Sequence, residues 1–184
     1  MEEVDAFNYL NPDKECLVYI SESKILDAGN GIFAKSYIKK NTPLIIYFGN
    51  LIHANETLES YESNEDNYIK NVSPYLRDSV FKNYVIDPSI LFDEPDIDII
   101  LKGYIVNDYS NITSIYNSDI QKYIDSKDNC NVTIMETKDY PIYYSNRDIK
   151  KDEELYTHYG LGYWLIQNNI DVTKINSIIN EFKN

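Results

Sequence analysis

The residues best suited to chemistry lie near the C-terminal end, in residues 153–164, with the sequence EELYTHYGLGYW. A charged turn at 147–152 precedes them and separates two apolar runs, so we expect Tyr159 to be held at the end of a strand. A phenol fixed in this way can donate and accept hydrogen bonds at a reacting centre. The alternative is that Tyr159 is one of the chain's 18 tyrosines and packs the edge of a core, and spacing alone favours that interpretation.

A second candidate is the turn Gly29-Asn30-Gly31 near the start of the chain. Two glycines around one residue allow a ligand to approach backbone amides closely, or allow positive φ angles. No helical pattern follows the turn, as a dinucleotide-binding fingerprint would require, so an ordinary hairpin turn is the alternative.

Composition limits the classes of function. The chain has 184 residues and fits one domain, and its formal charge of −13 repels nucleic-acid phosphates and attracts a basic partner, although acidity also simply keeps a protein soluble. The two cysteines are too few for a disulfide framework or a zinc site, and His53 and His158 are not expected to form a metal pair. We expect no metal, no direct nucleic-acid binding and no membrane contact. Residues 1–5 have neither the basic start nor the apolar run of a secretory signal, so we expect an intracellular protein, nuclear or cytoplasmic.

The elements that position these residues are predicted to be mostly short strands with few helices. Residues 1–15 form a loose leader, residues 16–164 form the main domain, and 165–184 form an amphipathic helix, because apolar residues recur there at helical spacing. We expect inserts near 53–77, 89–102 and 110–128, the last of them able to form a short helix. The predicted strands lie at 16–20, 44–52, 81–87, 129–135 and 141–145, with the last two paired as a hairpin.

Several weak motifs occur along the chain in a particular order. The three main ones are the glycine turn followed by IFA, YIVNDYS at 104–110, and EEL at 153–155 leading to Tyr159-Gly160. Further matches are IKKNTP at 38–43 with Tyr47-x-Gly49, and the segments 85–87, 128–130 and 147–155. The ordered set resembles the SET-domain family of protein lysine methyltransferases, from about residue 23 to residue 164.

The resemblance implies a fold and a site. The fold is a set of small curved β-sheets (β-clip-like) in which 106–108 and the residues up to Tyr159 thread together as a pseudoknot. S-adenosylmethionine would lie on one side of the knot, and a substrate lysine would enter from the other side. The resemblance implies Tyr159 and Tyr47 as catalytic residues, and a substrate channel lined by Tyr47, Tyr109, Thr157 and Tyr159. The implied cofactor-binding residues are Ala28, Gly29, Asn30, Gly31, Tyr104, Asn107, Asp108 and Trp164, with the indole of Trp164 as a platform for the adenine ring.

The residue types suit methyl transfer. Oxygen acceptors hold an electron-poor sulfonium methyl in line, and a buried lysine beside a cation loses its proton readily, because burial and a like charge both lower its pKa. The partner would be a basic, Lys-rich protein segment. A histone tail fits this description, as does any flexible Lys-rich segment.

The chain also departs from the family pattern. Asp108 stands where the family usually has His, and Thr157 is small where Phe or Tyr commonly restricts the number of methyl groups, so di- or trimethylation is expected to be possible. Asp108 and the inserts leave open a SET-like binding module that has lost catalysis and binds a basic partner. A third interpretation is that the tyrosines only pack sheets. The oligomeric state stays open, because the apolar stripe of the terminal helix can pack on its own domain or on another chain.

Overall fold

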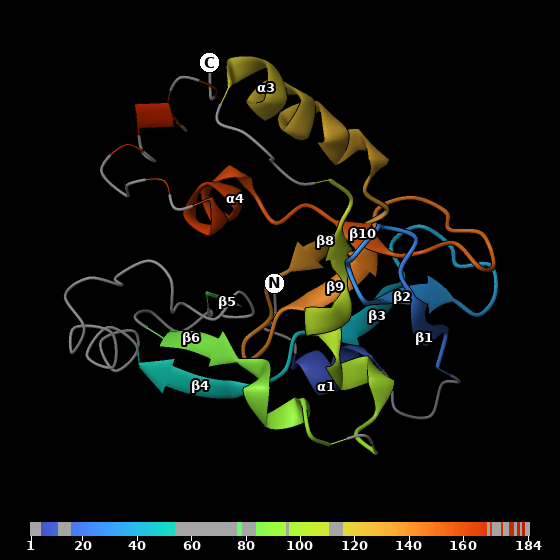
Figure 1. Ribbon diagram of the computed structural model, residues 1–184. Coiled ribbons are helices and arrows are strands. Elements are labelled where there is room, and N and C mark those ends of the chain that lie inside the picture. Colours follow the sequence, from blue (N-terminus) through green and yellow to red (C-terminus); the bar gives the residue numbers. More distant parts are fainter. Residues whose placement is uncertain are drawn as a thin grey trace.

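The computed structural model (Figure 1) describes residues 5–10, 16–53, 77–78, 84–94, 96–110, 116–168 and 170, and also 174, 177–178, 180 and 182. The described helices are α1 (Ala6–Tyr9), α3 (Asn117–Asp125) and α4 (Leu161–Gln167), with short 3-10 helices η1 (Pro88–Leu91), η2 (Ile99–Leu101), η3 (Gly103–Ile105) and η4 (Ser126–Asn129). The described strands are β1 (Val18–Glu22), β2 (Asn30–Ala34), β3 (Pro43–Ile46), β4 (Asn50–His53), β5 (Arg77–Asp78), β6 (Tyr84–Asp87), β7 (Asn107–Asp108), β8 (Val132–Met135), β9 (Ile142–Ser145) and β10 (Tyr156–Thr157).

The described strands form small sheets, as the sequence predicted. β1 pairs antiparallel with β2, and the two larger sheets are antiparallel with strand orders β3-β9-β8 and β4-β6-β5. The predicted hairpin between the last two long strands is present, with Val132 opposite Ser145 and Met135 opposite Ile142. Ile45 and Ile142 are fully buried, so the β3-β9-β8 sheet lies against the core.

The predicted strand at 44–52 is wrong as a single element. β3 ends at Ile46, β4 begins at Asn50, and the two strands belong to different sheets. Gly49, between the two strands, lets the backbone pass close to the end of β6, since a Cβ at this position would lie 2.3 Å from the backbone oxygen of Asp87. A largely apolar run conceals such a break, because its composition does not show where one strand ends and the next begins.

Residues 5–10 are not part of a loose leader. They contain α1, whose Ala6 is fully buried in a cluster with Ile46 and Ile142. The Ala6 N–H donates to Asp139 Oδ1 at 2.9 Å, which fastens this segment to the loop between β8 and β9.

The helices α3 and α4 lie side by side above the sheets in Figure 1. α3 confirms the short helix expected in the insert near 110–128. α4 begins at Leu161, so Trp164 lies inside a helix that starts earlier than predicted. Half of the predicted terminal helix lies outside the described residues, although the Phe182 N–H donates to the Ile178 oxygen at 3.3 Å, as in a helical turn.

The segments predicted to form the knot do meet. β7 and β10 pair in parallel, with Asn107 opposite Tyr156 and Asp108 opposite Thr157. This pairing brings the 104–110 motif beside the stretch that carries Tyr159.

Candidate active site

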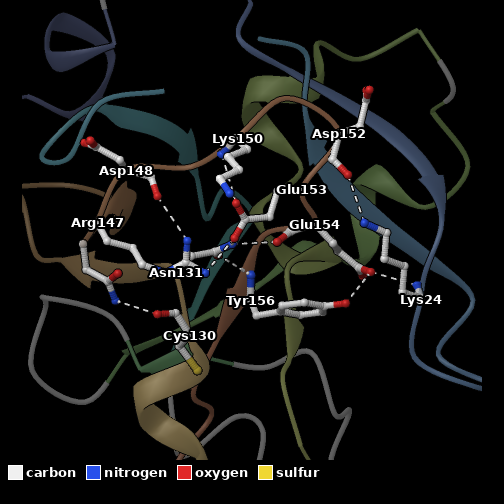
Figure 2. Close-up of polar contacts among 11 residues, drawn as sticks. Lys24, Cys130, Asn131, Arg147, Asp148, Lys150, Asp152, Glu153, Glu154 and Tyr156 are labelled. Carbon is white, nitrogen blue, oxygen red and sulfur yellow. Dashed lines mark hydrogen bonds and ion pairs between the residues drawn. The ribbon is translucent and has the colours of Figure 1, made fainter. Parts of the chain in front are cut away.

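Glu154 joins the glycine turn to the knot. Its carboxylate is completely buried and accepts hydrogen bonds from Ser23 Oγ (2.7 Å), the Lys24 N–H (2.8 Å), Tyr156 Oη (2.7 Å) and Asn107 Nδ2 (3.3 Å). Figure 2 shows this carboxylate between Lys24 and Tyr156. Four donors compensate for the loss of water around a buried carboxylate.

The glycine turn and the knot are also in direct contact. Asn107 Nδ2 donates to the Asn30 backbone oxygen at 3.0 Å. Gly31 lies in β2 and is buried against Glu154, so that an added Cβ would lie 2.2 Å from Glu154 Oε1. The lack of a side chain at Gly31 therefore leaves room for the Glu154 carboxylate.

The residues before β2 are more open. Gly29 has φ +71°, no atom lies within 4 Å of a Cβ built on it, and Asn30 is exposed. Ala28 is half-buried, and its N–H donates to the Ile25 oxygen at 3.2 Å. This edge of the turn is therefore open beside Gly29.

Asn131 holds the strand that leads to Tyr159 from its other side. This fully buried amide donates to the Glu154 backbone oxygen (2.7 Å) and to Glu153 Oε1 (3.2 Å), and accepts from the Tyr156 N–H (2.8 Å). Glu153 in turn pairs with Arg147 at 2.6 Å, as Figure 2 shows. Successive acids thus face opposite sides, Glu154 toward the glycine turn and Glu153 toward Arg147, as alternation along an extended chain requires.

Tyr159 follows this anchored strand. Its hydroxyl donates to the Val106 backbone oxygen at 2.8 Å, and its N–H donates to Asp108 Oδ2 at 2.9 Å. Burial, and then the neighbouring phenols of Tyr143 and Tyr163, raise the pKa of Tyr159 well above its usual value. The phenol therefore stays protonated at neutral pH and acts as a hydrogen-bond donor.

Tyr159 belongs to a cluster of four tyrosines. Tyr143 and Tyr47 are buried with ring centroids 6.5 Å apart, and Tyr163 contacts Tyr159 edge to face at 4.8 Å. Burial is the main cause that raises the pKa of Tyr47, and the neighbouring phenol of Tyr143 raises it further. Burial also raises the pKa of Tyr143, to about 12. The guanidinium of Arg77 lies 5.8 Å from the centre of the Tyr47 ring, so a cation already packs against this cluster.

The carboxylate of Asp108 points into the knot. It is 6% exposed, and its Oδ2 accepts from Tyr123 Oη (2.7 Å) and Trp164 Nε1 (2.8 Å) as well as from the Tyr159 N–H. The indole of Trp164 stacks on the ring of Tyr159 at 6.2 Å. One face of Trp164 is therefore covered by protein, and its role as a platform for adenine stays a prediction.

The other predicted site residues are more dispersed. Thr157 is buried, and its backbone oxygen accepts from the Tyr109 N–H at 3.3 Å. Tyr109 is 42% exposed, and its ring contacts Tyr156 edge to face at 5.4 Å. Tyr104 lies in η3, where its ring packs 5.2 Å from that of Phe92.

A cavity of about 670 Å³ opens beside Tyr159. Thr157 and Tyr159 line it, whereas the glycine turn, Tyr47 and the knot residues 107–108 do not. Three cations and two acids also line it, which reverses the charge balance of the chain: Arg77, Lys127, Arg147, Asp128 and Glu136.

Sequence reasoning missed several members of this site, namely Tyr143, Tyr163, Asn131, Glu154 and Tyr123. A signal for Tyr143 did exist, since it lies on a predicted strand and side chains alternate between the two faces. Nothing in the spacing of Tyr123 or Asn131 indicates that either would reach a segment far away in the sequence.

Comparison with known proteins settles the fold family. The SET domain family matches residues 29–160, which is most of the chain. The chain belongs to the SET domain family. A search of curated proteins gives no match. Among the described residues, no group of three or more His, Cys, Asp or Glu is arranged to hold a metal ion, and no helix is long and apolar enough to cross a membrane.

Solved structures show the same SET-domain fold. An active polycomb repressive complex 2 in the stimulated state is similar with a TM-score of 0.53 and 21% identity, covering 79% of this chain and 15% of that chain. The Chaetomium thermophilum polycomb repressive complex 2 bound to GSK126 gives a TM-score of 0.54 and 19% identity. The match covers 85% of this chain and 17% of that chain. A ctPRC2 in an autoinhibited conformation bound to S-adenosylmethionine gives a TM-score of 0.53 and 16% identity. The match covers 88% of this chain and 17% of that chain. The chain spans less than a fifth of these longer chains.

Proposed function

We propose that this SET domain transfers a methyl group from S-adenosylmethionine to the side-chain nitrogen of a protein lysine. The observation that carries the proposal is the position of Tyr159. Its hydroxyl donates to the backbone oxygen of Val106, the residue before the Asn107 that contacts the glycine turn, and Tyr159 is one of the residues that line the cavity.

The residues around the turn fit the cofactor. Asn30 is exposed, the space beside Gly29 is open, and phenol and carbonyl oxygens such as those of Tyr159 and Val106 are suitable neighbours for a cationic sulfonium. When bound, the cofactor supplies an electrophilic methyl carbon, so the bond from the lysine nitrogen to that carbon forms as the carbon–sulfur bond breaks. The lysine ammonium would release one proton to solvent before the attack, so that the neutral amine is the nucleophile.

The tyrosine cluster orients the lysine. The raised pKa values of Tyr159, Tyr47 and Tyr143 keep these phenols protonated, so they direct the amine by hydrogen bonds and do not remove its proton. The low dielectric around them favours a neutral amine. Orientation of the two reactants supplies about 7–11 kcal/mol of the barrier reduction in favourable systems.

The substrate is a flexible, basic protein segment of the kind that histones carry, in an intracellular setting, nuclear or cytoplasmic. The formal charge of −13 attracts such a segment over a distance. Within the cavity, Arg77, Lys127 and Arg147 favour neutral or acidic side chains next to the lysine.

Thr157 leaves room for more than one methyl group, since this small, buried residue lines the cavity two positions before Tyr159. Di- or trimethylation is the expected product. Mass spectrometry that finds only monomethylated peptide after exhaustive reaction would reject this.

A methyl-transfer assay with core histones and cell lysate, using tritiated cofactor, tests the function. Tyr159→Phe should abolish transfer while calorimetry still detects cofactor binding, whereas Tyr37→Phe, at an exposed position, should leave both unchanged. Unchanged turnover in Tyr159→Phe would defeat the assignment. A wild-type chain that binds no cofactor would instead favour the binding module that Asp108 and the inserts left open.

A further inference from the structure

The insert that carries α3 contributes a side chain to the centre of the knot. Tyr123 is 1% exposed, and its hydroxyl donates to Asp108 Oδ2 at 2.7 Å while accepting from the Gly160 N–H at 3.0 Å. A phenol hydroxyl has one proton, so these two bonds fix its orientation. Tyr123 thus links the carboxylate of Asp108 to the backbone that follows Tyr159.

Asp108 also binds this backbone, at the N–H of Tyr159, which is one residue before Gly160. A single carboxylate oxygen accepts from Tyr123 Oη, from the Tyr159 N–H at 2.9 Å and from Trp164 Nε1 at 2.8 Å. None of the ion pairs among the described residues involves Asp108. Its charge is therefore compensated by neutral donors, one of which, the Tyr159 N–H, belongs to the turn at 159–160.

We propose that Asp108 and Tyr123 are positioning residues for Tyr159, so that the α3 insert supports the active site directly. The inference rests on the proposed function, in which the Tyr159 phenol is the catalytic group. Two consecutive N–H groups, of Tyr159 and Gly160, are each held by one member of the Asp108–Tyr123 pair.

The local backbone explains why this support is needed. Gly160 has φ +97° and immediately precedes α4, so the residue after Tyr159 is conformationally permissive. Among the described residues, the Tyr159 hydroxyl donates to one acceptor, the Val106 oxygen. Displacing a reacting group by about 1 Å costs about 10²-fold in rate. Loss of the Tyr123 hydroxyl should therefore reduce kcat and leave substrate binding nearly unchanged.

The packing of Tyr123 suggests a purely structural alternative. Its ring stacks on His158 at 4.3 Å and meets Trp164 edge to face at 6.4 Å. Tyr123→Phe keeps this ring packing and removes only the hydroxyl. A role limited to packing therefore predicts no change of kcat in this variant.

The test compares Tyr123→Phe, Asp108→Asn and Asp108→Ala with Tyr116→Phe, a control at the exposed N-cap of the same helix. We expect kcat for a methyl-accepting peptide to fall about 10–100-fold in Tyr123→Phe, with KM within twofold of wild type. Asp108→Asn keeps an acceptor oxygen and should lose less than Asp108→Ala. Unchanged kcat, or a loss confined to KM, would overturn the inference.

A second readout is independent of catalysis. The chain has one tryptophan, so the indole N–H signal of Trp164 in an NMR spectrum reports on the bond to Asp108 without overlap. Amide exchange at Tyr159 and Gly160 should accelerate at least tenfold in Tyr123→Phe and not in Tyr116→Phe. If the wild-type chain transfers no methyl group, the proposed function fails, and equal exchange in both variants would then overturn the positioning role on its own.

Discussion

A methyl group added at Gly31 tests how the glycine turn is built. The Cβ of Gly31→Ala would lie 2.2 Å from Glu154 Oε1, 2.9 Å from Glu154 Cδ and 3.3 Å from Asn107 Nδ2. An ordinary contact is about 3.5–4.0 Å, so the carboxylate has to move by more than about 1 Å. That movement breaks its bonds from Ser23 Oγ (2.7 Å) and Asn107 Nδ2 (3.3 Å).

The expected cost follows from those bonds. A hydrogen bond to a charged group contributes about 1.5–3 kcal/mol, and a displaced side chain recovers part of the loss elsewhere. We expect Gly31→Ala to lower the free energy of unfolding by about 2–4 kcal/mol. Gly29→Ala, at φ +71° with open space around it, should cost only the backbone strain of about 1–2 kcal/mol.

Urea denaturation of four chains measures the coupling: wild type, Gly31→Ala, Glu154→Ala and the double variant. With the carboxylate removed, the added methyl group has only Asn107 Nδ2 left as a close neighbour, at 3.3 Å, so its cost should fall below about 1 kcal/mol. An equal cost of Gly31→Ala in both backgrounds would refute the contact between Gly31 and Glu154 as the reason for the glycine.

Three further predictions concern the supports of the strand before Tyr159. Asn131→Ala should lower the free energy of unfolding by about 2–4 kcal/mol in urea denaturation, because it removes one buried amide and leaves its partners unsatisfied. Cys130 should resist alkylation at pH 8 in the folded chain and react after unfolding, because burial, followed by Asp108, raises its thiol pKa to about 11. Partial burial alone would raise the pKa of Glu153, but hydrogen bonds, chiefly from Arg147, hold it below its usual range. That stabilisation is present above the unfolded pKa of about 4.3 and is lost as pH falls through the folded value, so Arg147→Gln should destabilise the fold by about 0.5–1 kcal/mol at pH 7 and by less at pH 3 in thermal unfolding.

The local part of the fold was predictable from the sequence. Alternating or apolar runs located the hairpin of β8 and β9, and Pro88 marked the end of β6, since proline cannot continue a paired strand. The ordered motifs indicated the family, which the match over residues 29–160 confirms. These signals depend on neighbouring residues, which is why they can be recognised in a single sequence.

The contacts that build the site were not predictable in this way. Glu154 reaches Ser23 across 131 positions of the chain, and Asp108 receives the hydroxyl of Tyr123 from inside an insert. Gly31 was assigned to the glycine turn and lies in strand β2, where its neighbour is a carboxylate. Long-range partners are chosen by the packed fold, and no periodicity records them.

The long-range contacts along residues 153–160 determine how precisely the phenol of Tyr159 is held. From 153 to 160, successive residues are bound by different segments: Glu153 by Arg147, Glu154 by the glycine turn, Tyr156 by Asn131, and the 159–160 turn by the Asp108–Tyr123 pair. Because these segments lie on opposite sides of one extended strand, no single contact can shift without straining the others. A small error in the position of a reacting group is costly in rate, so rigid support from several sides is what a catalytic tyrosine requires. The network thus supports the Tyr159 backbone from several sides, and this is the physical reason to propose chemistry for this one of the chain's 18 tyrosines.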